Sequence, residues 1–351
     1  MIRLGIIGTG GMAQVHANCF IWRKNVRLAA CCDPDAARLD AFAEKNKIPK
    51  KYADYRELIA DGGVDAVCNV TPDAAHCEVA LAALKAKKHI LSEKPLAANL
   101  AEARRMAAAA AKAGVINMVH FSYRNSAGLR AAAQLVARGK IGRVLHVEAS
   151  YLQGWLSNFN PAHFAQRPEG LWRLSTRHGS QGDLGDIGCH ILDLASFLAG
   201  DIVGLRATLR TFDKGVKNNR VGDYHLDAND SFAATADFAG GGLGAIHSSR
   251  WATGQGNSLR CRVYGDKGAV EVDLDRSYTA YRACLGKDIH ASKWEEHEAK
   301  PTPDLFTRFV KSIVTGKNDP CDFQAGLKVQ AYLDACFASD REGGKYVKIK
   351  L

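Results

Sequence analysis

Short apolar runs alternate with helical patterns along the first 120 residues of the chain. Five runs of mostly apolar and β-branched residues have the length of buried strands: Arg3–Ile7, Arg27–Cys32, Ala66–Val70, His89–Leu91 and Val115–Val119. The segments between them carry apolar residues at helical spacing, at Gly11–Ile21, Pro34–Lys45, Ala74–Ala86 and Asn99–Ala113. This alternation predicts an α/β domain with a doubly wound parallel sheet over residues 1–122.

The pattern changes over residues 123–351. Strand-like runs follow one another with turn-length connections, at Gly142–Leu152, Val203–Phe212, Asp230–Phe238, Gly244–Trp251, Leu259–Tyr264, Ala269–Leu274 and Tyr346–Lys350. Helices are expected at Ser126–Arg138, Asp183–Leu198, Asp304–Thr315 and Phe323–Ser339. The series predicts an α+β domain with a mostly antiparallel, open sheet. The irregular stretch Gln153–Gly182 has the length of a functional loop.

Length and composition agree with two domains of ordinary size in a globular enzyme. The chain has 351 residues, of which 47% are hydrophobic and 24% charged. No apolar run reaches the roughly 20 residues that span a bilayer, and the chain enters its first strand without a signal-peptide pattern. We therefore expect a cytoplasmic protein that does not bind membranes.

The net charge of +10 does not point to nucleic acid, because the basic residues are spread evenly. Residues 1–120 carry 17 Lys and Arg against 12 Asp and Glu, and the rest carry 30 against 25. Such a spread is typical of a solvated surface. The ten cysteines form no C-x-x-C pair, so we expect reduced thiols, without a metal site or a disulfide framework.

A glycine-rich loop follows the first predicted strand and opens the first helix, with the sequence Gly8-Thr9-Gly10-Gly11-Met12-Ala13. Gly8 permits the tight turn, Gly10 lets a pyrophosphate approach the backbone at the helix N-terminus, and Ala13 is small where helix meets sheet. In this context the loop predicts dinucleotide binding.

Asp33, at the end of the second strand, is placed to accept hydrogen bonds from the adenosine ribose hydroxyls. The tripeptide Asp33-Pro34-Asp35 supplies two negative charges and no arginine, so it would repel a 2′-phosphate. NAD is thus favoured over NADP.

A second polar constellation lies on the helix expected at Asp183–Leu198, where Asp186, His190 and Asp193 share one face. A carboxylate and an imidazole held together on a rigid element suit proton transfer to or from a hydroxyl. Alternatively, the acids merely suit the helix dipole and the histidine packs.

Several motifs occur in the order seen in the family of glucose–fructose oxidoreductase, inositol 2-dehydrogenase and rhizopine-catabolism proteins, and the chain resembles that family over essentially its whole length. They are Gly8-x-Gly10-x-x-Ala13, Thr71-Pro72 with His76, Glu93-Lys94-Pro95, Tyr123-Arg124, Gly185-Asp186-Ile187-Gly188-x-His190-x-x-Asp193 and Gly326-Leu327. Within the family, Tyr151–Trp155 and Trp172-Arg173 are most similar to levoglucosan and inositol dehydrogenases.

The resemblance implies a catalytic set of Lys94, Asp186 and His190. Lys94 follows a parallel strand at the edge where ligands bind, and its ammonium would stabilise the developing alkoxide. His190 would take the hydroxyl proton, with Asp186 supporting it. The cofactor residues carried over are Gly8, Thr9, Gly10, Gly11, Met12, Asp33, Thr71, Pro72, His76, Glu93, Lys94 and Arg124.

Other polar residues have two open interpretations. Tyr123 and Arg124 either line the nicotinamide pocket or, for the arginine, clamp the two domains. Four residues of the long loop either offer an aromatic face and hydrogen bonds to a sugar ring or pack the loop or a subunit interface: Gln153, Trp155, Trp172 and Arg173.

These features predict an NAD-dependent dehydrogenase that oxidises a secondary hydroxyl of a cyclic polyol or sugar. The alternatives are a glycosidase that retains its NAD and a non-catalytic dinucleotide-binding regulator. The second domain, expected to bind substrate and mediate oligomerisation, leaves one sheet face unaccounted for, so a homodimer or homotetramer is expected.

Overall fold

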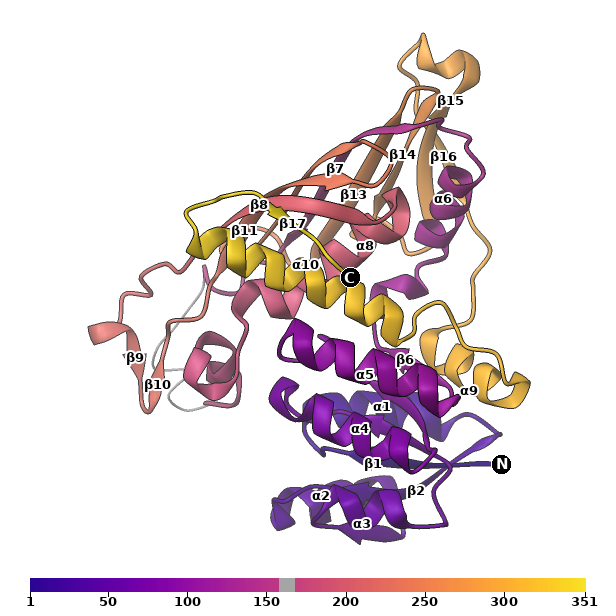
Figure 1. The fold of residues 1–351 in the computed structure, drawn as a ribbon, viewed down its shortest axis with the longest axis vertical. Coiled ribbons are helices and arrows are strands. Elements are labelled where there is room, and N and C mark those ends of the chain that lie inside the picture. Colours follow the sequence, from indigo (N-terminus) through magenta and orange to yellow (C-terminus); the bar gives the residue numbers. More distant parts are fainter. Residues whose placement is uncertain (158–167) are drawn as a thin grey trace. The chain divides into compact units, whose positions relative to one another are not determined.

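The computed structural model describes residues 1–157 and 168–351, and the chain divides into two compact units. The first comprises Met1–Phe121 and Pro303–Gln330, and the second comprises Ser122–Thr302 and Ala331–Leu351. Figure 1 shows the elements of both. Among the described residues, no helix is both long and apolar enough to cross a membrane.

The first unit contains a six-stranded sheet in the order β3-β2-β1-β4-β5-β6, with every pair parallel. Its strands are β1 (Ile2–Ile7), β2 (Val26–Cys32), β3 (Lys50–Tyr52), β4 (Ala66–Asn69), β5 (His89–Ser92) and β6 (Asn117–Val119). This order is that of a doubly wound dinucleotide-binding sheet, so the fold predicted from the alternation is confirmed. The short edge strand β3 was not predicted, because its sequence KKY has no apolar run.

Helices connect these strands: α1 (Gly11–Ile21), α2 (Ala36–Asn46), α3 (Tyr55–Ala60), α4 (His76–Lys85) and α5 (Leu100–Ala113). Asp35, Asp54 and Asn99 cap α2, α3 and α5 by accepting hydrogen bonds from first-turn amides. In α5 the small residues Ala103, Ala107 and Ala110 are buried, so the alanine-rich run is an ordered helix.

The first unit also includes α9 (Leu305–Thr315) and the beginning of α10 (Phe323–Arg341), which the sequence division at 122/123 places in the second domain. Hydrogen bonds to β6 explain the difference. The Val119 amide donates to the Cys321 carbonyl at 2.8 Å, and the Phe323 amide donates to Asn117 Oδ1 at 2.9 Å. Such distant pairing leaves no local signal in the sequence.

The second unit contains a nine-stranded sheet in the order β16-β15-β14-β13-β7-β12-β11-β8-β17. Its strands are β7 (Val144–Leu152), β8 (Ile202–Arg210), β11 (Ser231–Phe238), β12 (Leu243–Ser249), β13 (Ser258–Gly265), β14 (Gly268–Asp273), β15 (Ala280–Leu285), β16 (Glu295–Glu298) and β17 (Val347–Lys348). Only the β7–β12 pair is parallel among these pairings. The predicted mostly antiparallel sheet is confirmed. A separate hairpin joins β9 (Arg220–Val221) and β10 (Tyr224–His225).

Helices lie against one face of the large sheet. Helix α8 (Cys189–Ala199) contacts β7, β12 and β13, and α6 (Ala127–Ala137) contacts β14 and β15 (Figure 1). Along β11, Phe232 and Ala234 are buried while Ala233 and Thr235 are exposed, the two-residue period of a half-buried strand. One face of the sheet therefore packs on helices and the other carries exposed side chains.

Candidate active site

The glycine-rich loop of the first unit has the backbone that a dinucleotide requires. Gly8 adopts φ +89°, and a Cβ there would lie 2.5 Å from the Val70 carbonyl oxygen, so only glycine fits. A Cβ at Gly10 or Gly11 would meet nothing within 4 Å, which leaves open space beside the start of α1. Gly10 is the N-cap of α1 and supplies no side-chain hydrogen bond. No capping side chain therefore competes with an anion for the first amides of α1.

Asp33 lies behind this loop and is almost fully buried. Its Oδ2 accepts from the backbone amide and the hydroxyl of Thr9, both at 2.9 Å. Its Oδ1 accepts from the Asp35 amide and from Arg38, both at 3.0 Å. Burial raises the pKa of Asp33, but the hydrogen bonds from Asp35, Arg38 and Thr9 outweigh it and lower that pKa below its usual value. Asp33 is therefore a fixed anion.

An arginine, Arg38, lies beside the tripeptide Asp33-Pro34-Asp35. Its guanidinium lies 3.0 Å from Asp33 and 3.7 Å from Asp35, and half of its side chain is exposed. The sequence interpretation considered only the tripeptide and missed this arginine, which lies in the first turn of α2.

The carboxyl ends of β1, β4, β5 and β6 lie side by side, because Ile7 pairs with Asn69, Asn69 with Ser92, and Ser92 with Val119. The residues that follow these strands share this edge, where doubly wound sheets bind ligands. They are the loop Gly8–Met12, the Thr71-Pro72 pair and the Glu93-Lys94 pair. The first unit thus brings the predicted cofactor residues of its own loops to one edge.

His76 connects two of these loops instead of facing solvent. It is fully buried, with Nδ1 2.9 Å from the Pro95 carbonyl and Nε2 2.9 Å from the Thr71 carbonyl. The peptide between Lys94 and Pro95 is cis. His76 therefore holds the backbone on either side of the ligand edge.

Glu93 is also buried, and both His16 Nε2 and His120 Nδ1 lie 2.8 Å from its Oε1. Burial raises the pKa of Glu93, yet the two imidazoles lower it well below its usual value, and burial lowers the pKa of His16. The arrangement fits a buried carboxylate that accepts hydrogen bonds from both imidazoles. The three ligand atoms lie within 4.8 Å of one another, the residue types of a metal site, but these hydrogen bonds account for them without one.

In the second unit, Asp186 lies in a π-helical turn, Leu184–Gly188, and α8 begins only at Cys189. The prediction of one continuous α-helix through Asp183–Leu198 is therefore wrong for its first turn. A Cβ at Gly188 would lie 2.8 Å from the Phe232 ring, so this glycine lets the turn pack closely on β11. Turns of this kind widen the helix and often occur at functional sites.

His190, in the first turn of α8, is buried against two tyrosines. The Tyr123 ring meets it edge-on with centroids 4.9 Å apart, and the Tyr151 ring lies at 6.3 Å. The two tyrosine hydroxyls are hydrogen-bonded to each other. Burial and the neighbouring Tyr123 raise the pKa of Tyr151, so this phenol keeps its proton at neutral pH.

Two residues of the long loop that were predicted to bind substrate, Gln153 and Trp155, join this cluster. Gln153 Nε2 donates to Asn257 Oδ1 at 2.8 Å and to the Tyr151 hydroxyl at 3.2 Å. Trp155 Nε1 donates to Gln153 Oε1 at 3.1 Å, and Asn257 Nδ2 donates to the Tyr123 hydroxyl at 2.9 Å. Tyr123, Gln153 and Trp155 are thus connected through hydrogen bonds. Residues 158–167 of the predicted loop lie outside the described residues.

Two arginines reach Asp186. Arg250 Nη2 donates to Asp186 Oδ2 at 2.9 Å, and Arg173 Nε lies 3.7 Å from the same oxygen. The Arg173 guanidinium lies over the Trp172 ring, 4.6 Å from its centroid. Arg173 therefore lies beside Asp186, and Trp172 packs against the Arg173 guanidinium.

Arg124 and Asp193 form a separate pair. The Arg124 guanidinium donates to both carboxylate oxygens of Asp193, at 2.9 and 2.6 Å, and lies over the Phe197 ring. All of these residues belong to the second unit. Asp193 thus anchors the segment before α6 to α8, although the sequence placed it on one face with Asp186 and His190.

Sequence reasoning missed the partners that lie far away in the chain. Arg250 follows β12, Tyr151 ends β7 and Asn257 precedes β13. Tyr151 was noted only for the family resemblance. The tyrosine and asparagine are recognisable only once the register of the sheet places β7 and β13 side by side.

Asp183, directly before the π-helical turn, is a buried carboxyl group whose protonation state can be tested. It is fully buried, Ser248 donates a hydrogen bond to it, and burial raises its pKa to about 8. Because the unfolded chain ionises near the ordinary value of 3.8 while the folded chain keeps the proton, the stability contribution of Asp183 falls as pH rises from about 4 to about 8.

We therefore expect Asp183→Asn to gain in free energy of unfolding relative to the unchanged protein between pH 5 and pH 8. Urea unfolding of both proteins at the two pH values measures this difference. A difference that stays constant across the range contradicts a neutral Asp183.

Comparison with known proteins gives consistent matches over both units. The profile of an oxidoreductase family with an NAD-binding Rossmann fold, GFO/IDH/MocA, matches residues 2–121, and that of the GFO/IDH/MocA C-terminal domain matches residues 129–271. Levoglucosan dehydrogenase of Pseudarthrobacter phenanthrenivorans is 28% identical, over 78% of this chain and 74% of its own length.

Two further similarities extend these matches. Myo-inositol 2-dehydrogenase of Thermotoga maritima is 31% identical, over 79% of this chain and 77% of its own. A solved structure of levoglucosan dehydrogenase with NADH and levoglucosan superposes with a TM-score of 0.85 over 100% of both chains. Its identity is 24%, so this likeness concerns the fold.

Proposed function

This chain belongs to the GFO/IDH/MocA family of NAD-binding oxidoreductases, and we propose that it oxidises a secondary hydroxyl of a cyclic polyol or sugar. One observation carries the proposal. In the second unit, Asp186 and the loop residues Trp172 and Arg173 gather beside a buried arginine, while Gln153 and Trp155 are bonded into the tyrosine cluster around His190. A binding-only protein has no need of such acid–base groups.

NAD fits the first unit because open space adjoins Gly10 and Gly11 and because Asp33 is a fixed anion behind the loop. The residues that would hold it are Gly8, Thr9, Gly10, Gly11, Met12, Asp33, Thr71 and Pro72, with Glu93 and His76 holding the adjacent backbone. When bound, NAD supplies the acceptor for a hydride from the substrate carbon.

Three side chains carry the chemistry in this proposal. His190 Nε2 or Nδ1 accepts the proton of the substrate hydroxyl, and the Asp186 carboxylate stabilises the resulting imidazolium. Lys94 donates a hydrogen bond to the same substrate oxygen and stabilises its developing negative charge. Trp155 and Trp172 offer apolar faces to a sugar ring, and Gln153 and Arg173 offer hydrogen bonds to its hydroxyls.

A screen of cyclic polyols and sugars for NADH absorbance tests the proposal. We expect at least one to reduce NAD in a protein-dependent way. Should the folded protein bind NAD and reduce it with none of them, the proposed substrate class is wrong.

We expect NAD to bind much more tightly than NADP, because the Asp33 carboxylate repels a 2′-phosphate. In Asp33→Ala the difference between the NAD and NADP affinities should narrow. Arg38 loses its closest carboxylate partner there, so its positive charge becomes available to a 2′-phosphate. Calorimetric titration with NAD and NADP measures this difference in affinity. The control is Asp40→Ala, which removes an exposed carboxylate from α2, the helix that carries Arg38. Equal affinity of the unchanged protein for NAD and NADP would overturn the assignment.

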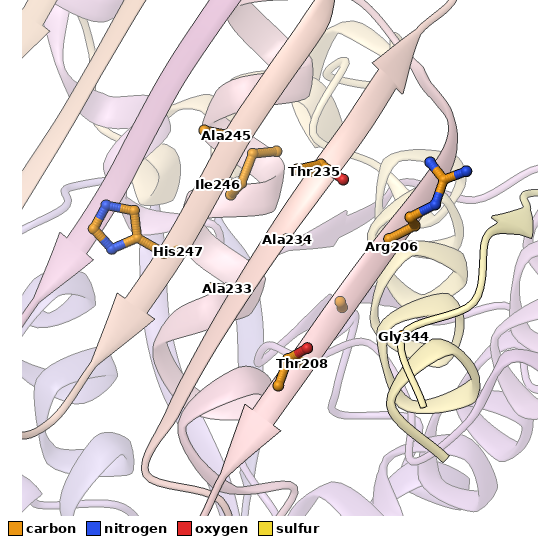
Figure 2. A pocket seen from close by; sticks show the side chains of 10 residues that line it. Arg206, Thr208, Ala233, Ala234, Thr235, Ala245, Ile246, His247 and Gly344 are labelled. Atoms are coloured by element: carbon orange, nitrogen blue, oxygen red, sulfur yellow. The ribbon is translucent and has the colours of Figure 1, made fainter. Parts of the chain in front are cut away.

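The exposed face of the large sheet supports the expected homodimer or homotetramer. Figure 2 shows the small residues Ala233, Thr235 and Ala245 between Arg206 and His247. These residues line a cavity of about 370 Å³. In the part of the chain that the structure describes, no helix contacts these small side chains, which suits close approach of a second copy.

Light scattering at micromolar concentration is expected to give a dimer or tetramer. Ala245→Arg, which adds bulk and charge to the middle of this face, should shift the mass toward the monomer. Ala53→Arg, an exposed substitution in the first unit, should not. A stable monomer for the unchanged protein refutes the expectation.

A further inference from the structure

Arg250 is a charged side chain with no solvent exposure, and the chemistry above makes no use of it. Its Nη2 donates to Asp186 Oδ2 at 2.9 Å and to the Gly182 carbonyl at 3.2 Å, while its Nη1 donates to the Arg173 carbonyl at 3.1 Å. The guanidinium therefore joins the Asp186 carboxylate to the backbone on two segments, one directly before the π-helical turn and one beside Trp172. Burying an arginine is costly unless its charge is paired and hydrogen-bonded, and here Asp186 supplies the paired charge.

The guanidinium is itself held rigidly. Arg250 follows β12, its amide donates to the Asp230 carbonyl at 2.9 Å, and its carbonyl accepts from the Leu156 amide at 3.1 Å. The Trp155 ring lies against the guanidinium, 5.3 Å from its centroid. Because the end of a central strand fixes the backbone and an aromatic ring fixes the head group, the donor geometry offered to Asp186 is preorganised.

Three buried or half-buried carboxyl groups lie near Arg250, and only one needs its charge. Asp230 is paired with Lys214 at 2.8 Å, with neither side chain exposed. Asp183 keeps its proton at neutral pH, since burial raises its pKa to about 8. Asp186 remains, and a second charged group near it is the partly exposed Arg173, whose Nε lies 3.7 Å from Asp186 Oδ2.

We propose that Arg250 is a positioning residue for proton transfer: it holds the Asp186 carboxylate in a fixed orientation as an anion, so that Asp186 can support His190. This inference rests on the proposed function. It assigns to Arg250 two separable effects. Its hydrogen bonds orient the carboxylate, and its positive charge keeps both Asp186 and His190 easier to deprotonate. Among the described residues, the groups that face this cluster include Arg173, Asp183, Tyr123, Tyr151, Lys214 and Asp230.

The test compares Arg250→Met, Arg250→Lys and Arg250→Ala with the unchanged protein, using its best substrate. We expect Arg250→Met to lower kcat by about 10²-fold with an unchanged NAD Kd, because a misplaced catalytic group loses about that much. The acid-side limb of kcat/KM should move to higher pH, since removal of a positive charge raises the pKa of nearby groups. Arg250→Lys keeps the charge, so its limb should stay in place while kcat falls.

Two controls separate positioning from folding. Arg308→Met removes another buried arginine that pairs with a carboxylate, Asp319 at 3.0 Å, and should lower stability without moving the pH limb. Guanidinium chloride at millimolar concentration should restore part of the kcat of Arg250→Ala and none in Asp186→Ala. If Arg250→Met does not fold, the kcat and pH profile of Arg250→Lys and the guanidinium rescue of Arg250→Ala test the role of Arg250 instead.

The inference is overturned if Arg250→Met and Arg250→Lys keep kcat within twofold and an unmoved pH limb, or if folded Arg250→Ala shows no rescue. An assay of the unchanged protein in parallel separates a failure of the proposed function from a failure of the proposed role of Arg250. If it reduces no NAD with any polyol, the proposed function fails; if it is active and the Arg250 variants match it, only the role of Arg250 fails.

Discussion

Replacement of His190 by alanine is expected to lower kcat by about 10²–10⁴-fold while the NAD Kd stays nearly unchanged. The expectation follows from its proposed role, because a positioned base that accepts the hydroxyl proton contributes this much to a rate. His190 lies in the second unit beside Tyr123 and near Tyr151, so its removal leaves the glycine-rich loop of the first unit intact. Steady-state kinetics and calorimetry measure the two quantities.

The pH profile gives the same prediction a second readout. The kcat/KM of the unchanged protein should rise through a group in the histidine range, and the rise should flatten in His190→Ala. His290→Ala, an exposed histidine elsewhere in the second unit, is the matched control and should keep the unchanged profile. A folded His190→Ala that binds NAD and oxidises the substrate at a near-normal rate removes His190 from the mechanism.

Lys94→Ala is expected to lose activity to a similar extent, because the substrate oxygen loses its charged donor as negative charge develops on it. Lys94 follows β5 at the ligand edge of the parallel sheet, and its amide donates to Glu93 Oε2 at 3.2 Å. Lys112→Ala, which removes an exposed lysine from α5 of the same unit, should leave kcat unchanged.

The double variant tests whether Lys94 and His190 act in one step. If both act on one oxygen, the loss in Lys94→Ala/His190→Ala should be smaller than the product of the two single losses. Losses that multiply fully would mean that the two residues serve different steps. A normal kcat in Lys94→Ala would exclude Lys94 from catalysis altogether.

The parallel half of the fold was predictable because its strands are buried on both faces and read as continuous apolar runs, such as that of β4 with its buried residues Ala66–Asn69. Two edge strands that escaped prediction lack this signal. β16 has the sequence EEHE, and β3 has KKY. Edge strands like these are defined by hydrogen bonds to a neighbour, here β15 and β2, and their side chains need not be apolar.

The candidate site was predictable only where its residues are local in sequence. The spacing of Asp186 and His190 indicated a shared helix face. The π-helical turn packs closely on β11 with Gly188 against Phe232, and no local pattern encodes that long-range packing. Likewise, the pairing of Asp193 with Arg124 depends on how α8 meets the segment before α6. Long-range partners of this kind need the fold before they can be named.

The measurement that tests the account most directly is the stoichiometry of NADH and oxidised product during turnover of the best substrate from the polyol screen. A dehydrogenase releases one NADH for each oxidised sugar or polyol, so we expect both to accumulate in equal amounts and well beyond the enzyme concentration. A glycosidase that retains NAD regenerates its cofactor in each cycle. Turnover that yields cleaved sugar with no net NADH would contradict the proposed dehydrogenase function.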